Sequence, residues 1–316
     1  MKVAILDAAT LGEDLSMESF ERFGEVFVYP ITTEEQLPSR LAEVDTVIIN
    51  KVKLNAGNLI HAKKLSLICI TATGFDNVDL EYCRAHGIAV CNVVGYSTQS
   101  VAQVTVSMAL SLITHLPEYH RFVAGGEYTR SGKFNCLTPV FHEIAGKTWG
   151  IVGYGNIGKQ VARVAEALGC RVLVYKRTPV AEATCVDFDT ICKESDILSL
   201  HIPLNEGTFH LLDRDHIGML KKDAIVINVA RGAVADEATL TDAILEDRIG
   251  ALGVDVYSVE PMGPQHPFQK ILAYPNVCLT PHMAWGGYET RVRLLDEVAQ
   301  NMDSFLQGGT RCRVDL

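Results

Sequence analysis

The stretch Thr148-Trp149-Gly150-Ile151-Val152-Gly153-Tyr154-Gly155-Asn156-Ile157-Gly158 decides the fold of this chain. The apolar run over residues 148–152 predicts a buried strand, and the apolar spacing over residues 159–168 predicts a helix that follows it. Glycines spaced G-x-G-x-x-G between a strand and a helix are typical of a dinucleotide-binding turn. The alternative interpretation of this pattern is a glycine-rich turn that binds no ligand.

Each glycine of this turn has its own role in the dinucleotide interpretation. Gly153 permits the tight turn, Gly155 lets a pyrophosphate approach the backbone, and Gly158 allows the helix to pack closely on the strand. Asn156 and Ile157 lie in the turn that opens the helix, where unpaired N–H groups and the positive end of the helix dipole favour phosphate. All of these residues are therefore candidates for cofactor binding.

Strands and helices alternate on both sides of this turn, which predicts the α/β fold class with parallel sheets. The strands expected in the same domain are residues 148–152, 172–175, 197–201, 224–228, 250–254 and 277–280. Earlier buried strands are expected at residues 2–6, 26–29, 46–49, 67–70 and 89–91, with helices at 17–23, 34–41 and 80–86. A buried apolar helix is expected from Val101 to Ile113, then a polar stretch over 117–143, and a last helix over 288–306.

Composition limits the class of protein. The 316 residues suggest about two domains, and 28 Lys and Arg against 38 Asp and Glu give a net charge of −10, which argues against nucleic-acid binding. We expect no membrane span, since no apolar run is long enough, and no signal peptide at the N-terminus. The nine cysteines form no C-x-x-C pair, which favours reduced, mostly buried thiols over a metal site and predicts a cytoplasmic protein.

The residues after the second strand of the cofactor domain bear on the choice of cofactor. An acidic residue there would bind the ribose 2′-hydroxyl of NAD(H), but this strand is followed by Lys176, Arg177 and Thr178. Two cations and a hydroxyl suit a 2′-phosphate, so the sequence favours NADP(H) over NAD(H). The alternative is that the cations are simply solvated at a strand end.

Three polar residues follow later strands, at the sheet edge where an open α/β fold binds ligands. They are Arg231, Glu260 and His282. Singly, they read as a surface arginine, a turn glutamate and a histidine at a helix start. Together, beside a dinucleotide turn, they suit hydride transfer to a ketone, which needs a proton donor for the oxygen and a cation for a substrate carboxylate.

These motifs resemble those of the D-isomer-specific 2-hydroxyacid dehydrogenases, over nearly the whole chain. The resemblance is carried by the glycine-rich turn, residues 71–79 (TATGFDNVD), residues 199–204 (SLHIPL), and the segments around the three polar residues. Asn50-Lys51, residues 72–79 and His282-Met283-Ala284-Trp285 are most similar to the glycerate dehydrogenase (hydroxypyruvate reductase) branch.

The resemblance implies a role for each residue. His282 would be the general acid of reduction, Glu260 would orient and stabilise its protonated imidazole, and Arg231 would bind the substrate carboxylate. Further cofactor contacts are implied at His201, Pro203, Ala230 and, toward the nicotinamide carboxamide, Asp255. Further substrate contacts are implied at Lys51, Thr73, Gly74, Phe75 and Trp285. The alternatives are a solvated surface lysine for Lys51 and a packed aromatic for Trp285.

The resemblance also implies a domain organisation. Residues 1–98 with 288–316 would form a flavodoxin-like substrate domain, and residues 99–287 an NAD(P)-binding Rossmann domain, with the active site in the interdomain cleft. Family members are homodimers through the cofactor domain, and no metal is implied.

The expected function is therefore that of an NAD(P)H-dependent D-2-hydroxyacid dehydrogenase that reduces hydroxypyruvate or glyoxylate. One alternative is a D-lactate-type enzyme that reduces pyruvate or another small 2-keto acid. A second, from another class, is a dinucleotide-sensing binding module of the corepressor type.

Overall fold

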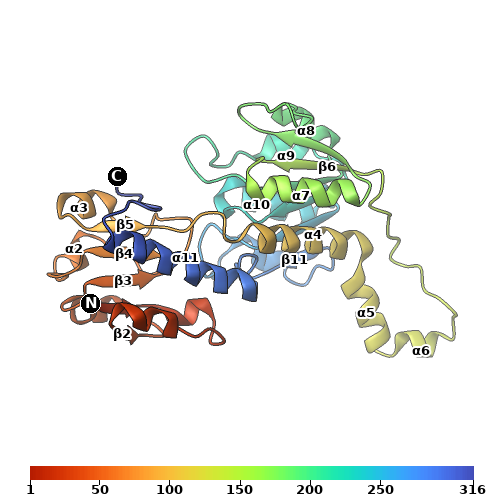
Figure 1. The fold of residues 1–316 in the computed structure, drawn as a ribbon. Helices are drawn as coiled ribbons and strands as arrows, with labels where there is room; N and C mark the ends of the chain where they lie inside the picture. Colours follow the sequence, from red (N-terminus) through yellow and green to blue (C-terminus); the bar gives the residue numbers. More distant parts are fainter. The chain divides into compact units, whose positions relative to one another are not determined.

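The computed structural model describes all residues from Met1 to Leu316. The chain forms two compact units. Unit 1 comprises Met1–Ser97 and Gly286–Leu316, and unit 2 comprises Thr98–Trp285. Each unit is built on its own parallel sheet with helices on its faces (Figure 1).

Unit 1 has a five-stranded parallel sheet in the order β2-β1-β3-β4-β5, which is the flavodoxin-like order. Its strands are β1 (Lys2–Ile5), β2 (Glu25–Val28), β3 (Thr46–Ile49), β4 (Leu67–Ile70) and β5 (Ala89–Cys91). Its helical segments are η1 (Ala8–Leu11), η2 (Glu18–Phe23), η3 (Glu34–Gln36), α1 (Leu37–Leu41), α2 (Ala56–Leu59), α3 (Leu80–Ala85) and α11 (Tyr288–Leu306). Strands β3 and β4 are buried along their whole length, as expected for the interior of a parallel sheet. Strand β5 is at the edge of the sheet and is also buried, because the C-terminal segment covers it through the bridge of Cys91 with Arg313.

The C-terminal segment completes unit 1. Helix α11 packs on β4, and the amide of Asn301 donates to the carbonyl of Asn92 at 2.9 Å. After the helix, the N–H of Val314 donates to the carbonyl of Val90 at 2.9 Å. The unit is therefore discontinuous in sequence.

Three segments of unit 1 differ from expectation. The strand expected to be buried at 26–29 is β2, an edge strand with Glu25 and Val28 exposed, because β1 is its only neighbouring strand and no bridge covers its other side as Arg313 covers β5. The helix expected at 17–23 is a 3-10 helix, and the one expected at 34–41 is divided into η3 and α1, where Pro38 stands in the first turn. Such short segments lack the length that sustains an α-helix.

Unit 2 has a six-stranded parallel sheet in the order β11-β10-β9-β8-β6-β7. Its strands are β6 (Thr148–Val152), β7 (Arg171–Tyr175), β8 (Ile197–Leu200), β9 (Ile225–Asn228), β10 (Ala251–Val254) and β11 (Val277–Leu279). An isolated parallel bridge of Cys185 with Val174 adds a rudimentary strand beyond β7, which the sequence analysis missed. Counted with this bridge, the order matches that of dinucleotide-binding folds, and its reversal point lies between β6 and β8.

Helices cover both faces of this sheet (Figure 1). The helical segments of unit 2 are α4 (Thr98–Thr114), α5 (Leu116–Ala124), α6 (Glu127–Ser131), α7 (Asn156–Ala167), α8 (Phe188–Glu194), α9 (Arg214–Met219), η4 (Gly232–Val234), α10 (Glu237–Leu245) and η5 (Pro267–Ile271). Helices α4 and α7 share one core with Trp149 and Ile151, and α8, α9 and α10 share another with Leu198 and Leu200. The stretch expected to be polar contains α5 and α6, which project away from the sheet (Figure 1).

No single helix is long and apolar enough to cross a membrane. Helices α4 and α5 pass such a test only as a pair, by length and composition, and they are bent by 61° where they meet. In this structure α4 buries Val101, Met108 and Leu112 in the core of unit 2. All nine cysteines are free, with five buried and four partly exposed.

Candidate active site

The glycine-rich turn lies between β6 and α7, as its spacing predicts. Gly153 has a φ of +99°, and a Cβ on it would lie 2.6 Å from the carbonyl oxygen of His201. A Cβ on Gly158 would lie 2.0 Å from the carbonyl oxygen of Gly153, whereas Gly155 has nothing within 4 Å. No side chain caps the amino end of α7. The turn therefore offers uncapped N–H groups and open space at Gly155, which fits a dinucleotide pyrophosphate.

His201 follows β8 at the reversal point of the sheet, beside this turn. Its Nε2 lies 3.0 Å from the hydroxyl of Ser199, and that hydroxyl accepts the indole N–H of Trp149 at 2.9 Å. The hydroxyl of Ser199 must also donate its own proton, and an indole cannot accept one. The imidazole Nε2 of His201 is therefore the acceptor of the serine proton. The ring of His201 is then neutral, with its proton on Nδ1. Burial lowers the pKa of His201 to about 3, in agreement with a neutral ring.

The Nδ1 of His201 is buried and has no protein partner, although the residue as a whole is only partly buried. A buried donor without an acceptor costs about 1–3 kcal/mol. An oxygen of a bound dinucleotide is an acceptor of the required kind, so the orphan donor is a second feature that fits this group at the reversal point.

We expect nitrogen-15 NMR to show His201 as the neutral Nδ1–H tautomer, without titration between about pH 5 and pH 9. Ser199→Ala removes the donor that selects this tautomer, so we expect its spectrum to show both tautomers. His201→Asn identifies the signal by its loss. A His201 signal that moves to imidazolium shifts within that range would contradict the assignment.

The cations expected to select the cofactor follow β7. Arg177 and Thr178 are exposed and Lys176 is partly exposed, and neither cation has an ion-pair partner. The sequence analysis missed Glu182 in the same loop, which pairs with Lys159 of α7 at 3.1 Å. Residues 176–182 of this loop therefore contain two unpaired cations and one carboxylate that is already paired.

His282 and Glu260 are brought together after β11 and β10. The Nδ1 of His282 lies 2.7 Å from Oε2 of Glu260, and Oε1 of Glu260 accepts the N–H of Tyr257 at 3.0 Å. A carboxylate only accepts, so Nδ1 carries the proton and Nε2 is left to exchange a proton with a substrate. His282 has a φ of +52°, a conformation that is uncommon outside glycine and asparagine and that occurs at functional sites.

Asp255, the residue expected to bind the nicotinamide carboxamide, is 1% exposed. Its carboxylate accepts the hydroxyl of Thr280 at 2.6 Å and the N–H groups of Met283 and Ala284 at 2.8 and 2.9 Å. Asp255 therefore holds the segment that carries His282. A carboxylate offers about four acceptor positions, and these contacts use three of them.

Arg231 lies in the turn that follows β9, and the buried side chain of Asn228 holds this turn in place. The Asn228 amide donates to the carbonyl of Arg231 at 2.9 Å and accepts the N–H of Ala230 at 3.0 Å. The guanidinium donates to the carbonyl of Ala230 and has no carboxylate partner, so it is available for an anion. Its side chain has no hydrogen bond to Glu260 or His282. Trp285 packs against the core that α4 and α7 share, and Pro203 is exposed.

In unit 1, the residues expected to contact substrate lie on two loops that are joined. Asp7, which the sequence analysis missed, accepts the N–H groups of Asn50, Lys51 and Val52 at 2.6 to 3.1 Å. The amide of Asn77 donates to the carbonyls of Asn50 and Val52, which links this loop to the one that follows β4.

On that second loop, the hydroxyl of Thr73 donates to the carbonyl of Val93 at 2.8 Å. Gly74 is partly exposed, Phe75 is 40% exposed, and the amine of Lys51 has no ion-pair partner. Unit 1 therefore brings the Lys51 loop and the Thr73–Phe75 loop together.

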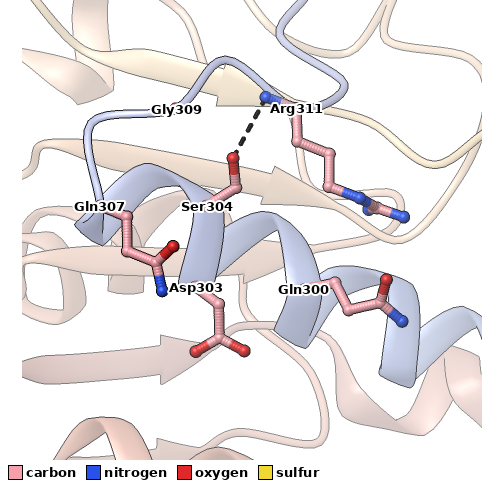
Figure 2. A pocket seen from close by; sticks show the side chains of 6 residues that line it. All are labelled: Gln300, Asp303, Ser304, Gln307, Gly309 and Arg311. Atoms are coloured by element: carbon pink, nitrogen blue, oxygen red, sulfur yellow. Dashed lines mark hydrogen bonds between the residues drawn. The ribbon is translucent and has the colours of Figure 1, made fainter.

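Other features of the surface are less specific. No group of three or more His, Cys, Asp or Glu side chains is placed to hold a metal ion. A hollow of about 390 Å³ lies beside α11. Figure 2 shows the residues that line it: Gln300, Asp303, Ser304, Gln307, Gly309 and Arg311. Arg311 is paired there with Glu297 at 2.5 Å, and none of the lining residues is a candidate for cofactor or substrate binding.

The chain is similar to known proteins over nearly its whole length. It is 35% identical over 311 residues to the glycerate dehydrogenase of Methylorubrum extorquens, covering 97% of this chain and 96% of that protein. It is 31% identical over 317 residues to the hydroxypyruvate reductase of Blautia hydrogenotrophica, covering 98% of each. The crystal structure of D-lactate dehydrogenase from Aquifex aeolicus with NAD and lactic acid superposes with a TM-score of 0.84 at 25% identity, covering 98% of this chain and 96% of that one.

The family model for the NAD-binding domain of D-isomer specific 2-hydroxyacid dehydrogenases matches residues 106–284, the part of the chain that carries the glycine-rich turn, Arg231, Glu260 and His282. With full-length relatives above 30% identity, this match confirms the expected family and the oxidoreductase class. The chain belongs to the family of D-isomer specific 2-hydroxyacid dehydrogenases.

Proposed function

We propose that the protein reduces a small 2-keto acid, either hydroxypyruvate or glyoxylate, with NADPH favoured over NADH. The observation that carries the proposal is the 2.7 Å contact between His282 and Glu260, on the same unit as an unpaired Arg231 guanidinium. A proton donor with an orienting carboxylate and a free cation are what reduction of a 2-keto acid requires.

Each residue has a defined part in this reaction. The nicotinamide, when bound, supplies the hydride to the carbonyl carbon. His282 gives a proton from Nε2 to the carbonyl oxygen and becomes neutral. Glu260 accepts a hydrogen bond from Nδ1–H throughout, and its charge stabilises the imidazolium before the transfer. Arg231 binds the carboxylate through its two-pronged guanidinium. We also propose that further residues contact the substrate, namely Lys51, Thr73, Gly74, Phe75 and Trp285.

The preference for a small substrate rests on similarity to the glycerate dehydrogenase and hydroxypyruvate reductase relatives. Steady-state rates with hydroxypyruvate, glyoxylate, pyruvate and a bulky keto acid, each with NADH and NADPH, test it directly. We expect the highest kcat/KM with hydroxypyruvate or glyoxylate. A clear preference for pyruvate would favour the D-lactate-type alternative. Tight cofactor binding without turnover of any keto acid would favour a binding module.

The cofactor preference depends on the two unpaired cations after β7. Arg177→Ala removes the planar cation, and we expect the KM for NADPH to rise by about tenfold or more while the KM for NADH stays within about twofold. Arg163→Ala, on an exposed position of α7, is the matched control and leaves both values unchanged. Equal effects of Arg177→Ala on NADPH and NADH would exclude a 2′-phosphate contact.

The proposal includes a homodimer formed through unit 2. Around α5 and α6, several large apolar side chains are exposed, among them Phe134 (95%), Leu137 (68%) and Val140 (69%). Exposed apolar side chains gathered on one segment are typical of an interaction surface.

A further inference from the structure

Glu237, the first residue of α10, is a buried acidic residue outside the groups that touch substrate or cofactor in the proposed reaction. It is 8% exposed. A buried carboxylate is costly unless hydrogen-bond donors surround it. Its position at a helix start accounts for part of its stabilisation, because the helix dipole favours a negative charge there.

Three donor groups face this carboxylate. Oε1 accepts the N–H of Ser258 at 2.8 Å, and Oε2 accepts the hydroxyl of Ser258 at 2.5 Å. The Nε2 of His266, itself 9% exposed, lies 3.0 Å from Oε2, although its N–H is not aligned with that oxygen. Because Nδ1 of His266 accepts the N–H of Phe268 at 3.3 Å, the proton of this ring is on Nε2.

Ser258 belongs to the segment that presents Glu260 to His282. The N–H of its neighbour Tyr257 donates to Oε1 of Glu260, while Oε2 of Glu260 is the atom that contacts the imidazole. The hydroxyl of Tyr257 donates to the carbonyl of Thr280 at 2.9 Å, just before His282. Burial, with Asp255 and Glu260 nearby, raises the pKa of Tyr257 to about 12, so this hydroxyl keeps its proton.

The same segment packs on the turn of Arg231. A Cβ on Gly232 would lie 2.1 Å from both the backbone nitrogen of Ser258 and the carbonyl carbon of Tyr257. Gly232 begins η4, which leads through Asp236 to Glu237. Glu237 is thus linked along the chain to Arg231 and by hydrogen bonds to the segment of Glu260.

We propose that Glu237 is a positioning residue, whose carboxylate fixes Ser258 so that Glu260 reaches Nδ1 of His282. Ser258 and His266 complete this buried cluster. The inference rests on the proposed function for its kinetic consequence, but the geometry that it predicts can be observed without turnover.

Glu237→Gln is the decisive variant. The glutamine amide has the same shape as the carboxylate, but its NH₂ group faces the donors of Ser258 and His266, so at least one of the present hydrogen bonds is lost. We expect kcat to fall by about tenfold or more, with the Kd of the cofactor unchanged. We also expect the pH profile of reduction to differ from that of the wild type, because a displaced Glu260 no longer orients the imidazole of His282. Asp255 and Tyr257, the other ionisable groups beside the His282 segment, are intact in this variant. Glu246→Gln, the same change at the exposed end of α10, is the matched control and keeps wild-type kinetics.

Proton NMR separates this inference from the proposed reaction. The Nδ1 proton of His282, bonded to Glu260, is expected at low field and is identified by its loss in Glu260→Gln. We expect the signal to shift or broaden in Glu237→Gln and to persist in Glu246→Gln. If the wild type turns over no keto acid, the proposed function fails, and this signal still tests the role of Glu237.

If Glu237→Gln does not fold, Ser258→Ala is the substitute variant. It removes the hydroxyl that donates to Glu237 and keeps the hydrogen bond from the backbone N–H of residue 258. We expect a smaller change of the same kind in kcat, pH profile and the low-field signal. A folded Glu237→Gln or, failing that, Ser258→Ala with wild-type kcat, pH profile and low-field signal would overturn the proposal.

Discussion

His282→Asn is expected to lower kcat for keto-acid reduction by about 10²- to 10⁴-fold, the usual contribution of a positioned general acid. The variant keeps the shape of the segment, because asparagine tolerates the φ of +52° that alanine would strain. The glycine-rich turn and the Asp255 contacts are untouched, so the cofactor Kd should stay within about twofold. Cofactor titration by fluorescence and steady-state rates measure the two quantities separately.

The pH dependence gives a second measure of the same role. Reduction needs the protonated imidazole, so the wild-type rate falls as pH rises, and oxidation of the hydroxy acid shows the opposite slope. Both slopes should flatten in His282→Asn. His210→Asn is the matched control: His210 also has a positive φ, of 48°, and its ring stacks on Phe209. Turnover near the wild-type level in His282→Asn would remove this histidine from the proton transfer.

Arg231→Ala is expected to lower kcat/KM by about 10²- to 10⁴-fold. The guanidinium has no carboxylate partner in the structure, so its two-pronged contact is free for the substrate carboxylate. Two hydrogen bonds between charged groups, at about 1.5–3 kcal/mol each, account for a loss of that size. The loss should include a higher KM for the keto acid, and the cofactor Kd should not change.

Further variants separate the charge of Arg231 from its geometry. Arg231→Lys keeps the charge without the planar fork and should fall between the wild type and Arg231→Ala. Added guanidinium ion should restore part of the activity of Arg231→Ala. Arg214→Ala, an exposed arginine on α9, is the control and leaves kcat/KM unchanged. An unaltered KM in Arg231→Ala would show that the carboxylate is bound elsewhere.

Local patterns in the sequence determined much of this protein. Strands β3, β4, β5 and β6 begin and end where predicted, because buried strands of a parallel sheet are continuous apolar runs bounded by polar residues. Helix α11 also spans the predicted residues, because its apolar positions recur with helical spacing. The glycine-rich turn was recognisable because its three glycines serve backbone contacts within a few residues of each other.

Only the tertiary structure decided which polar side chains are buried and what they bind. Asp7 contacts a loop more than forty residues away, and Glu237 contacts Ser258, 21 residues away, so no local pattern reveals either pair. In sequence, Glu237 resembles any acidic residue at a helix start. The edge position of β2 could not be predicted either, because an apolar run does not determine how many strands will lie beside it. Sequence periodicity reports which face of an element is apolar, whereas hydrogen-bond partners depend on how distant segments meet.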